Sequence, residues 1–579
     1  MRKLFIIFFF AMLGLSAMAV PAERRWQTFR QSDKSEITVQ LQGDECAHWF
    51  VTLDSKVVAR KANGDFCYLT LSHNTAKQTT ASTILAHNEA DRSEAERAFV
   101  SQEAISVEEY RQIASQHRQI APHKTSTPQP RRAKFEGKRK GLFILVQFED
   151  IKFSRTDIQQ AYDSICNFKN YSSGKFTGSV GDYFREQSDG QFELDFDVVG
   201  PVTVSKDEAY YGENSGWSTD GNLCEMVIEA LNLIGDSLDF TQYDWNEDGK
   251  ADQVFFLYAG YGEAQYAPSW TIWPCEGALS NFGYISELPK LGGVTFDTFA
   301  CSCELHGNEG SQLDGIGTIC HEFSHCMGLP DFYNTSDMTD FCMDAMDVMD
   351  QGAYNGHGGY SPAAYTGYER WYCGWRDFVE LTDPQEITDW QPLVSGGATY
   401  ILYNKADSTE YFLLDNREHV GFDEGMYATG MVVTHVHYDA DAWENNTVNT
   451  NKDHKRMAIL PADGIYDYKT CSKDAFPYTY MGGQRTLDSL SDYSHPYTKL
   501  FVKNTNGTYR LGKPLYKITK NEDMTMSFSF MIKPEADAIR EVAVPKLSTI
   551  YNLSGVAVGT DLDRLPKGIY IRNGKKVLK

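Results

Sequence analysis

The chain has few positive charges, no C-x-x-C pair and only one long apolar run. Lys and Arg total 54 against 79 Asp and Glu, a formal net charge of −25 over 579 residues. Because so acidic a chain repels nucleic acid and anionic membranes, neither is expected as a partner. The missing C-x-x-C pair argues against a cysteine-based zinc ribbon and against a thioredoxin-like redox site.

The single long apolar run lies at the N-terminus. Arg2 and Lys3 precede it, and it continues to Ala19, where Ala17-Met18-Ala19 fits the small-x-small rule for cleavage. Residues 1–19 are therefore predicted to be a signal peptide of the gram-negative bacterial type, and the protein is expected to be secreted or at the cell surface. The alternative is a short membrane anchor, but the run is shorter than the roughly 20 residues of a spanning helix. No later segment approaches that length, so no stable membrane span is expected.

The remaining composition is that of a globular protein. Hydrophobic residues make up 42% and aromatic residues 13%, which is enough apolar surface for several cores. A chain of this length has room for three to five domains of about 100–200 residues. The twelve cysteines are even in number, and export permits disulfides, but their pairing cannot be read from spacing. A monomer is expected.

The patterning changes near residue 138. Short alternating runs at residues 26–71 indicate strands, and residues 86–120, rich in Ala, Glu, Gln and Arg, favour helix. A Pro-rich stretch at 122–130 then ends in Arg131-Arg132. This composition predicts a linker, and the two arginines are an expected site of proteolytic cleavage. Residues 20–137 are therefore predicted to be an α+β prosegment.

The later domains differ in their periodicity. Apolar runs at 142–146 and 254–258 predict buried strands, with helical patterns between them, so residues 138–376 are predicted to be an α+β domain. From about residue 398, strand-like runs separated by turn residues favour a β-sandwich at 377–535. Residues 543–579 are short, strand-like and basic at the end, which predicts a small C-terminal β domain.

The segment His321-Glu322-Phe323-Ser324-His325 carries the clearest chemistry. Two histidines four residues apart on a helix share one face and can bind one metal ion. Glu322 is placed to take a proton from the metal-bound water as general base. Zinc lowers the pKa of such a water to about 7, which makes hydrolysis possible at neutral pH.

The residues after this helix predict a third ligand. Gly328 can adopt a left-handed conformation and end the helix, and Pro330 prevents its continuation. Asp331 would then be delivered to the metal from outside the helix, leaving one coordination position for water. The alternative is a surface helix with two unrelated histidines.

A second metal site is predicted at residues 244–252. Oxygen-bearing residues occupy positions 1, 3, 5 and 9 of a loop with Gly249 at position 6, as in the first part of a calcium loop. The alternative is an ordinary acidic turn before the strand at 254–258, and Phe255 at position 12 excludes a true EF-hand. The proposed calcium ligands, with the position-7 residue included, are Asp244, Asn246, Asp248, Lys250 and Asp252.

Several segments resemble one family of secreted zinc endopeptidases. The resemblance extends over roughly residues 138–532 and is to the metallopeptidases related to immune inhibitor A, a branch of the metzincins with Asp as third zinc ligand. The segments that carry it are residues 140–146, 179–190, 272–274, 304–305, 347–350 and 362–375, with 410–412 and 416–417 in the β region. It implies a metzincin-like fold for residues 138–376 and hydrolysis of peptide bonds in extracellular proteins.

The resemblance also implies roles for residues outside the zinc motif. Met349 would form the floor of the zinc site. The alternative is an ordinary core methionine, which would pack in the same way and also bind no metal. Tyr354, just after that turn, is a possible stabiliser of the oxyanion. Cys320 and Cys326 flank the histidines as a departure from the pattern, and their thiols are expected to point away from the metal. Residues 550–555 and 568–571 resemble C-terminal sorting domains of type IX secretion.

A secreted peptidase must be silent until it leaves the cell, so residues 20–137 are predicted to be inhibitory and the protein a zymogen. The segment 43–48 holds the densest group of possible zinc ligands there. Asp44 or Glu45 could supply an oxygen and Cys46 a thiolate; the alternative is a simple hairpin turn. Two other functions stay open, a non-enzymatic surface adhesin and a zinc hydrolase of a non-peptide substrate.

Overall fold

A computed structural model describes residues 17–71, 79–117, 134–214, 219–235, 238–282, 285–534, 550–559, 562–572 and 575–579. Most of the predicted signal peptide and the linker with Arg131-Arg132 lie outside these residues. The chain forms two compact units, Met1–Met531 and Ile532–Lys579. The chain combines several sheets with fewer helices, in agreement with the predicted α+β class, whereas the prosegment and sandwich assignments remain predictions.

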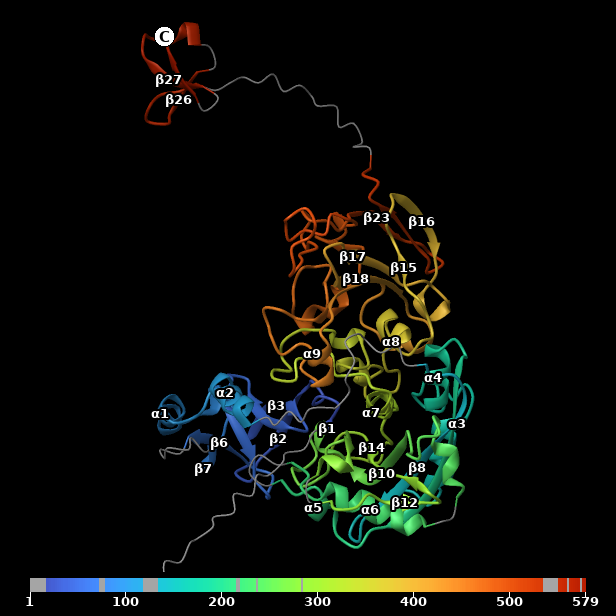
Figure 1. The fold of residues 1–579 in the computed structure, drawn as a ribbon. Helices are drawn as coiled ribbons and strands as arrows, with labels where there is room; N and C mark the ends of the chain where they lie inside the picture. The colour runs from blue at the N-terminus through green and yellow to red at the C-terminus, as the bar shows by residue number, and fades with distance from the viewer. Residues whose placement is uncertain are drawn as a thin grey trace, which may run out of the picture. The chain divides into compact units, whose positions relative to one another are not determined.

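The first sheet follows chain order and is antiparallel throughout (Figure 1). Both of its faces bury apolar residues: Ile37, Val39 and Leu41 belong to the main core, and Trp49, Val57 and Leu69 belong to a smaller one. Ser93 caps the first of the two helices that follow, by accepting the backbone N–H of Glu96. The strands are β2 (Trp26–Arg30), β3 (Glu36–Asp44), β4 (Ala47–Thr52), β5 (Val57–Arg60), β6 (Phe66–Leu71) and β7 (Thr79–Leu85), and the helices are α1 (Glu94–Gln102) and α2 (Val107–His117).

A central sheet of six strands has the order β1-β11-β14-β10-β8-β9. The inner pairs β10–β14, β8–β10 and β8–β9 are parallel, whereas β11 and β1 are antiparallel to their neighbours. Buried on both faces, its inner strands are continuous apolar runs. The strands are β1 (Ala17–Met18), β8 (Gly137–Gln147), β9 (Phe192–Thr203), β10 (Val254–Tyr261), β11 (Cys275–Ala278) and β14 (Thr298–Leu305).

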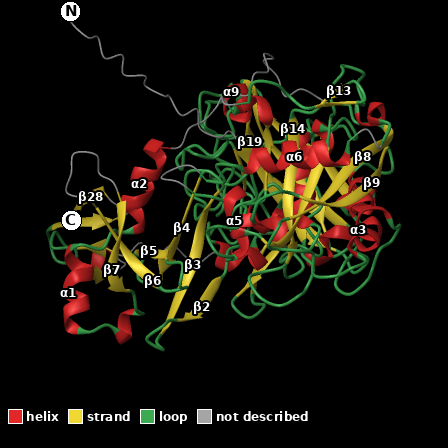
Figure 2. Ribbon diagram, turned by 90° about the horizontal axis from the view of Figure 1, so that it is seen from below, coloured by secondary structure: helices red, strands yellow, loops and turns green. Residues whose placement is uncertain are grey.

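Helices pack on this sheet. In Figure 2, α3 and α6 lie beside its strands; α3, α4 and α6 contact β9, while α7 contacts β14 and β11. A capping box between Ser179 and Asp182 begins α4. The helices are α3 (Ile158–Asn167), α4 (Val180–Gln187), α5 (Glu208–Tyr211), α6 (Leu223–Ile234), α7 (Gly317–Cys326) and α8 (Gly367–Tyr372), with a small hairpin of β12 (Lys290–Leu291) and β13 (Val294–Thr295).

Residues 379–530 form two further sheets, ordered β15-β17-β18-β19-β20 and β16-β24-β23. Their apolar side chains, such as Phe412 and Phe528, share one core. A helix, α9 (Ala440–Glu444), interrupts the path from β19 to β20. The strands are β15 (Val379–Glu380), β16 (Gln385–Trp390), β17 (Tyr400–Asn404), β18 (Asp407–Arg417), β19 (Gly430–His437), β20 (Met457–Ile459), β23 (Leu515–Lys520) and β24 (Met526–Phe530), besides the hairpin of β21 (Tyr478–Tyr480) and β22 (Arg485–Leu487).

The second unit contains a sheet of its own with the order β26-β25-β27-β28, all antiparallel. Its strands are β25 (Ile550–Tyr551), β26 (Ala557–Gly559), β27 (Ile569–Arg572) and β28 (Lys575–Leu578). Within the described residues of the chain, no helix combines the length and apolar character needed to cross a membrane.

Candidate metal centre

The two histidines of α7 are buried and face each other. Their Nε2 atoms lie 3.1 Å apart. The Nδ1 of His321 is 2.7 Å from the carbonyl oxygen of Val348, and the Nδ1 of His325 is 2.7 Å from that of Leu329. Since a carbonyl only accepts, each Nδ1 carries the proton and each neutral ring directs an Nε2 lone pair toward the other.

Asp331 completes the group from outside the helix. Gly328 has φ +92°, a left-handed conformation that suits glycine and turns the chain back. The Oδ1 of Asp331 lies 3.2 Å from the Nε2 of His321 and 3.3 Å from that of His325. The Asp331 side chain has no exposed surface, so its charge needs a cation beside it.

Three electron-pair donors therefore converge on one point. The Oδ1 of Asp331 is buried and has no hydrogen-bond partner among the described residues. Two imidazole lone pairs and a carboxylate oxygen repel one another unless a cation lies between them. Two nitrogens and one oxygen suit a zinc ion, with a fourth position left open. The residues present thus fit the metal predicted from the sequence.

Glu322 lies on the same helix and is fully buried. Burial raises its pKa well above the usual range of a glutamate. Its Oε1 accepts the backbone N–H of Val20 at 2.7 Å, whereas its Oε2 has no hydrogen-bond partner within the described chain. The side chain therefore contacts a peptide nitrogen, as an acid–base group beside a scissile bond must.

The peptide at Glu322 is part of an extended segment. Residues Ala17–Met18 form β1 and pair antiparallel with the edge strand β11. Ala19, Val20 and Ala22 have no exposed surface. Sequence reasoning treated this stretch as the signal cleavage site and gave no indication that it would lie at the metal centre.

Four side chains hold the backbone of this segment, which is named here the N-terminal cleft segment (residues 19–22). The hydroxyl of Tyr333 donates to the carbonyl of Ala19 at 2.9 Å, and that of Tyr354 to the carbonyl of Pro21 at 2.8 Å. The indole N–H of Trp273 donates to Val20 at 3.1 Å, and the Nε2 of Gln351 to Ala22 at 3.1 Å. Of these, only Tyr354 was predicted as a site residue; Trp273 lies in a segment that carries the family resemblance, whereas Tyr333 and Gln351 stand in no motif.

Met349 is completely buried in the turn that supports His321. Its backbone N–H donates to the Oδ1 of Asp347, its carbonyl accepts from Phe332, and its neighbour Val348 provides the carbonyl that orients His321. The turn therefore fixes a ligand ring through its backbone. The role of the Met349 side chain as the floor of the zinc site remains a prediction.

The two cysteines beside the ligands are thiols rather than thiolates. Burial raises the pKa of both Cys320 and Cys326 well above the usual value. The ligand atoms that cluster within 4.8 Å of one another on this helix belong to His321, Glu322 and His325. The cysteines therefore leave the predicted ligand set unchanged.

The predicted calcium loop wraps around its own carboxylates. The Oδ1 and Oδ2 of Asp244 accept the N–H groups of Asp248 and Gly249 at 3.0 and 2.8 Å. Asn246 and Asp248 accept from residues two positions further on, Asp248 and Lys250. Burial, with the nearby carboxylates, raises the pKa of Asp252 to about 6. The five residues are brought into one turn, but calcium binding stays a prediction.

Asp44, Glu45 and Cys46 form the turn between β3 and β4. The Oδ1 of Asp44 accepts the N–H groups of Cys46 and Ala47 at 3.0 and 3.2 Å. Its Oδ2 is 3.5 Å from the hydroxyl of Tyr333. These three residues form a ligand cluster separate from that of α7. The three residues thus lie in a hairpin turn, and their role in latency remains a prediction.

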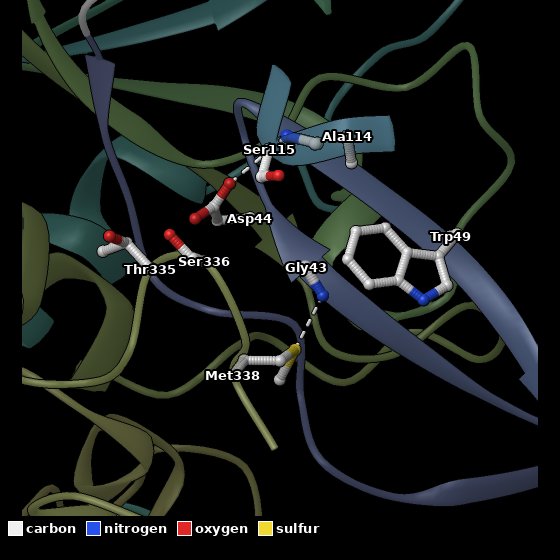
Figure 3. Close-up of a pocket in the computed structure, with 9 residues that line it drawn as sticks. Gly43, Asp44, Trp49, Ala114, Ser115, Thr335, Ser336 and Met338 are labelled. Carbon is white, nitrogen blue, oxygen red and sulfur yellow. Dashed lines mark hydrogen bonds between the residues drawn. The ribbon is translucent and has the colours of Figure 1, made fainter. Parts of the chain in front are cut away.

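The same hairpin packs closely against the catalytic part of the chain. Figure 3 shows Gly43, Asp44 and Trp49 opposite Thr335, Ser336 and Met338 around a small cavity. The backbone N–H of Gly43 contacts the sulfur of Met338 at 2.7 Å. The cavity holds only about 20 Å³, room for roughly one water molecule. The predicted prosegment is therefore fitted to its neighbour rather than loosely tethered.

A helix presenting two histidines, a glutamate and a returning aspartate defines a metal-dependent hydrolase. Residues 135–254 match the model of the family described as "Immune inhibitor A peptidase M6, catalytic domain". This match confirms the predicted resemblance and supports a metallopeptidase. It ends before α7, so the proposed ligands rest on the geometry above.

Two curated relatives extend the comparison. The chain is 27% identical over 242 residues to immune inhibitor A of Bacillus thuringiensis subsp. alesti, covering 34% of each chain. It is 24% identical over 273 residues to the pre-pro-metalloprotease PrtV of Vibrio cholerae serotype O1 (strain M66-2), covering 40% of this chain and 29% of the relative. The matched region thus spans about a third of the length of these relatives.

Proposed function

We propose that this protein is a secreted zinc endopeptidase in which His321, His325 and Asp331 hold the metal and Glu322 is the general base. The observation that carries the proposal is the convergence of three electron-pair donors beside a carboxylate that contacts a peptide nitrogen. The matching family is one of peptidases and one relative is a metalloprotease, which favours a peptide over another substrate.

The chain's own residues account for most of the chemistry. When bound, zinc supplies a Lewis acid that polarises the substrate carbonyl and the attacking water. Glu322 accepts the proton of that water at a carboxylate oxygen and returns it to the leaving amide nitrogen. The contact between Oε1 and the N–H of Val20 places the carboxylate beside such a nitrogen. Without β1, β11 would be the edge of the sheet and could pair with an extended peptide as it now pairs with β1.

The experiment that tests the function is a digest of casein or gelatin by the activated protein. A zinc chelator should abolish hydrolysis and added zinc should restore it. Hydrolysis that continues at full rate with the metal removed would contradict the proposal. Cleavage of small esters but of no polypeptide would instead favour a hydrolase of non-peptide substrates.

The protein is further proposed to be made as a zymogen. The N-terminal cleft segment occupies the place beside Glu322, and four donors hold its backbone. Cleavage after Ala19 would place the new amino group at the nitrogen that Glu322 contacts. One relative is named a pre-pro-metalloprotease, in keeping with a leader and a prosegment that are removed in turn. Asp44, Glu45 and Cys46 remain the rival silencing groups.

Export is proposed to use both ends of the chain. Residues 1–19 supply the signal peptide, and residues 543–579 the sorting domain, whose described part folds as a separate sheet. A chain without residues 543–579 should accumulate in the periplasm. Normal appearance of that shortened chain outside the cell would contradict the sorting role.

A further inference from the structure

One amide side chain holds Asp331, the third proposed metal ligand, at both its carboxylate and its backbone N–H. The Nδ2 of Asn446 donates to the Oδ2 of Asp331 at 2.6 Å, and its Oδ1 accepts the backbone N–H of Asp331 at 2.8 Å. This pairing occupies Oδ2 and leaves Oδ1 as the oxygen that faces the two histidines. The amide therefore selects which carboxylate oxygen is available to a metal.

Asn446 comes from a distant part of the chain. It follows α9 in the segment between β19 and β20, 115 residues beyond Asp331 and outside the predicted catalytic domain at 138–376. Its φ is +52°, a left-handed conformation that asparagine tolerates better than most residues. The strand-rich region thus completes a site that the catalytic part does not complete by itself.

Surrounding contacts keep the amide in place. The hydroxyl of Thr335 donates to the carbonyl of Asn446 at 3.1 Å. Further along the same loop, the Nδ2 of Asn449 donates to the carbonyls of Phe332 and Met457 at 2.7 and 2.6 Å. Asn449 therefore anchors the loop to the chain beside Asp331 without contacting the carboxylate.

We propose that Asn446 is a positioning residue for the metal centre, contributed by the strand-rich region, which orients Asp331 so that Oδ1 points toward His321 and His325. The inference rests on the proposed function for its metal. Hydrogen bonds that orient a metal ligand typically contribute about 10–100-fold to metal affinity. Loss of the Asn446 amide should weaken zinc binding by that factor and lower kcat more than it raises KM.

The test uses two variants of the full chain. Asn446→Gly removes the amide while allowing the left-handed backbone. Asn446→Asp keeps the size and the acceptor for the N–H of Asp331, but places an oxygen against Oδ2 in place of the donor. Zinc affinity is measured by competition with a chromophoric chelator, and the cobalt-substituted proteins are compared by their visible absorption spectra. Should Asn446→Gly fail to fold, Asn446→Asp answers the question alone.

The matched control is Asn451→Ala, at another asparagine of the same loop, whose Oδ1 accepts the backbone N–H of Asp453. We expect both Asn446 variants to lose 10–100-fold in zinc affinity, with an altered cobalt spectrum, and Asn451→Ala to retain both properties. Affinity within about twofold of the unmodified chain, or an equal loss in Asn451→Ala, would overturn the proposal. Metal binding is measured without substrate, so the two claims can be told apart. Tight zinc binding with no peptidase activity would refute the proposed function, and the Asn446 variants would still decide this inference. An unmodified chain that binds no zinc would overturn both.

Discussion

At the scale of single residues, the environment of each group decides its chemistry. His321 and His325 are equivalent in the sequence motif, and backbone carbonyls set the same tautomer in both. Burial raises the pKa of Glu322 well above its ordinary value. A raised pKa means that Glu322 holds a proton more tightly than an exposed glutamate does.

The residue-scale prediction concerns Glu322. Glu322→Gln should keep zinc bound, because Glu322 is not among the three ligands, but should lower the hydrolysis rate. Loss of a general base normally costs about 10²–10⁴-fold. The measurements are zinc content and the initial rate of casein cleavage by the activated protein. Asp331→Ala serves as the contrast, since it should lose zinc; a Glu322→Gln protein retaining more than about a tenth of the rate would rule out this base.

At the scale of elements, the hairpin β3–β4 is joined to the catalytic part by a buried ion pair. The Nε2 of His48 lies 2.8 Å from the Oε1 of Glu263, and its ring stacks on Trp273 at 4.6 Å. Burial alone would lower the pKa of His48, but the Glu263 carboxylate raises it to about 9. Trp273 also holds the carbonyl of Val20, so this contact lies directly beside the N-terminal cleft segment.

This pair predicts a pH dependence. The pKa of His48 is raised in the folded state above its ordinary value of about 6.5, so its stabilising effect is complete below pH 6.5 and is lost as pH rises through about 9. The cleaved prosegment should therefore dissociate faster between pH 8 and 10, as measured by the onset of activity after linker cleavage. Glu263→Gln should flatten this dependence.

The control for the pH effect is His87→Ala. His87 pairs with Asp33 and Glu96 within the first sheet region and its helix, away from the catalytic residues. Its removal should leave the pH dependence of dissociation unchanged. An identical response in His87→Ala and Glu263→Gln would exclude the His48 contact as the cause.

The loop at residues 244–252 is the second element with a testable role. If Asp244, Asn246, Asp248, Lys250 and Asp252 bind calcium, the ion should raise the melting temperature through ligand linkage. A chelator that removes calcium and spares zinc should then lower it. Asp248→Ala should melt at the lower temperature with or without calcium. An equal response to calcium in both proteins would place the ion elsewhere.

At the scale of the whole molecule, segments far apart in sequence build one site. The N–H of Val20 reaches Glu322 across 302 residues, and Asn446 reaches Asp331 across 115. Side chains of the first sheet and of the central sheet also belong to one apolar core. The predicted boundary near residue 138 is therefore not a break in the packing.

The whole-molecule prediction is latency. The chain beginning at Val20 should be inactive until it is cut between residues 120 and 141, whereas a chain beginning at Lys138 should be active on the same substrate. Removing residues 20–22 from the longer chain should release part of the activity, because the peptide contacts at Glu322 are lost. The measurement is casein hydrolysis by the three proteins.

The rival account of latency is tested in the same assay. Full activity of the uncut longer chain would refute an inhibitory prosegment. If deletion of residues 20–22 preserves latency while Asp44→Ala, Glu45→Ala or Cys46→Ala releases it, the hairpin turn is the silencing group.

Local sequence patterns predict many of the helices and strands. The apolar run at 142–146 predicts β8, and that at 254–258 predicts β10, because a strand buried on both faces needs continuous apolar residues. The spacing of His321 and His325 predicts one helical face, and Gly328 with Pro330 predicts the return of Asp331. These expectations concern residues within about ten positions of one another, where backbone geometry alone sets the distance.

Only the tertiary structure decided what surrounds the metal centre. Val20, Tyr333 and Asn446 follow no period and stand in no motif, so nothing local marks them. Their positions depend on how β1 pairs with β11 and on how the loop after α9 packs beside Asp331. The sequence alone therefore predicts the proposed ligands, because helix geometry acts over a few residues, whereas the groups that cover and orient them depend on packing between segments more than a hundred residues apart.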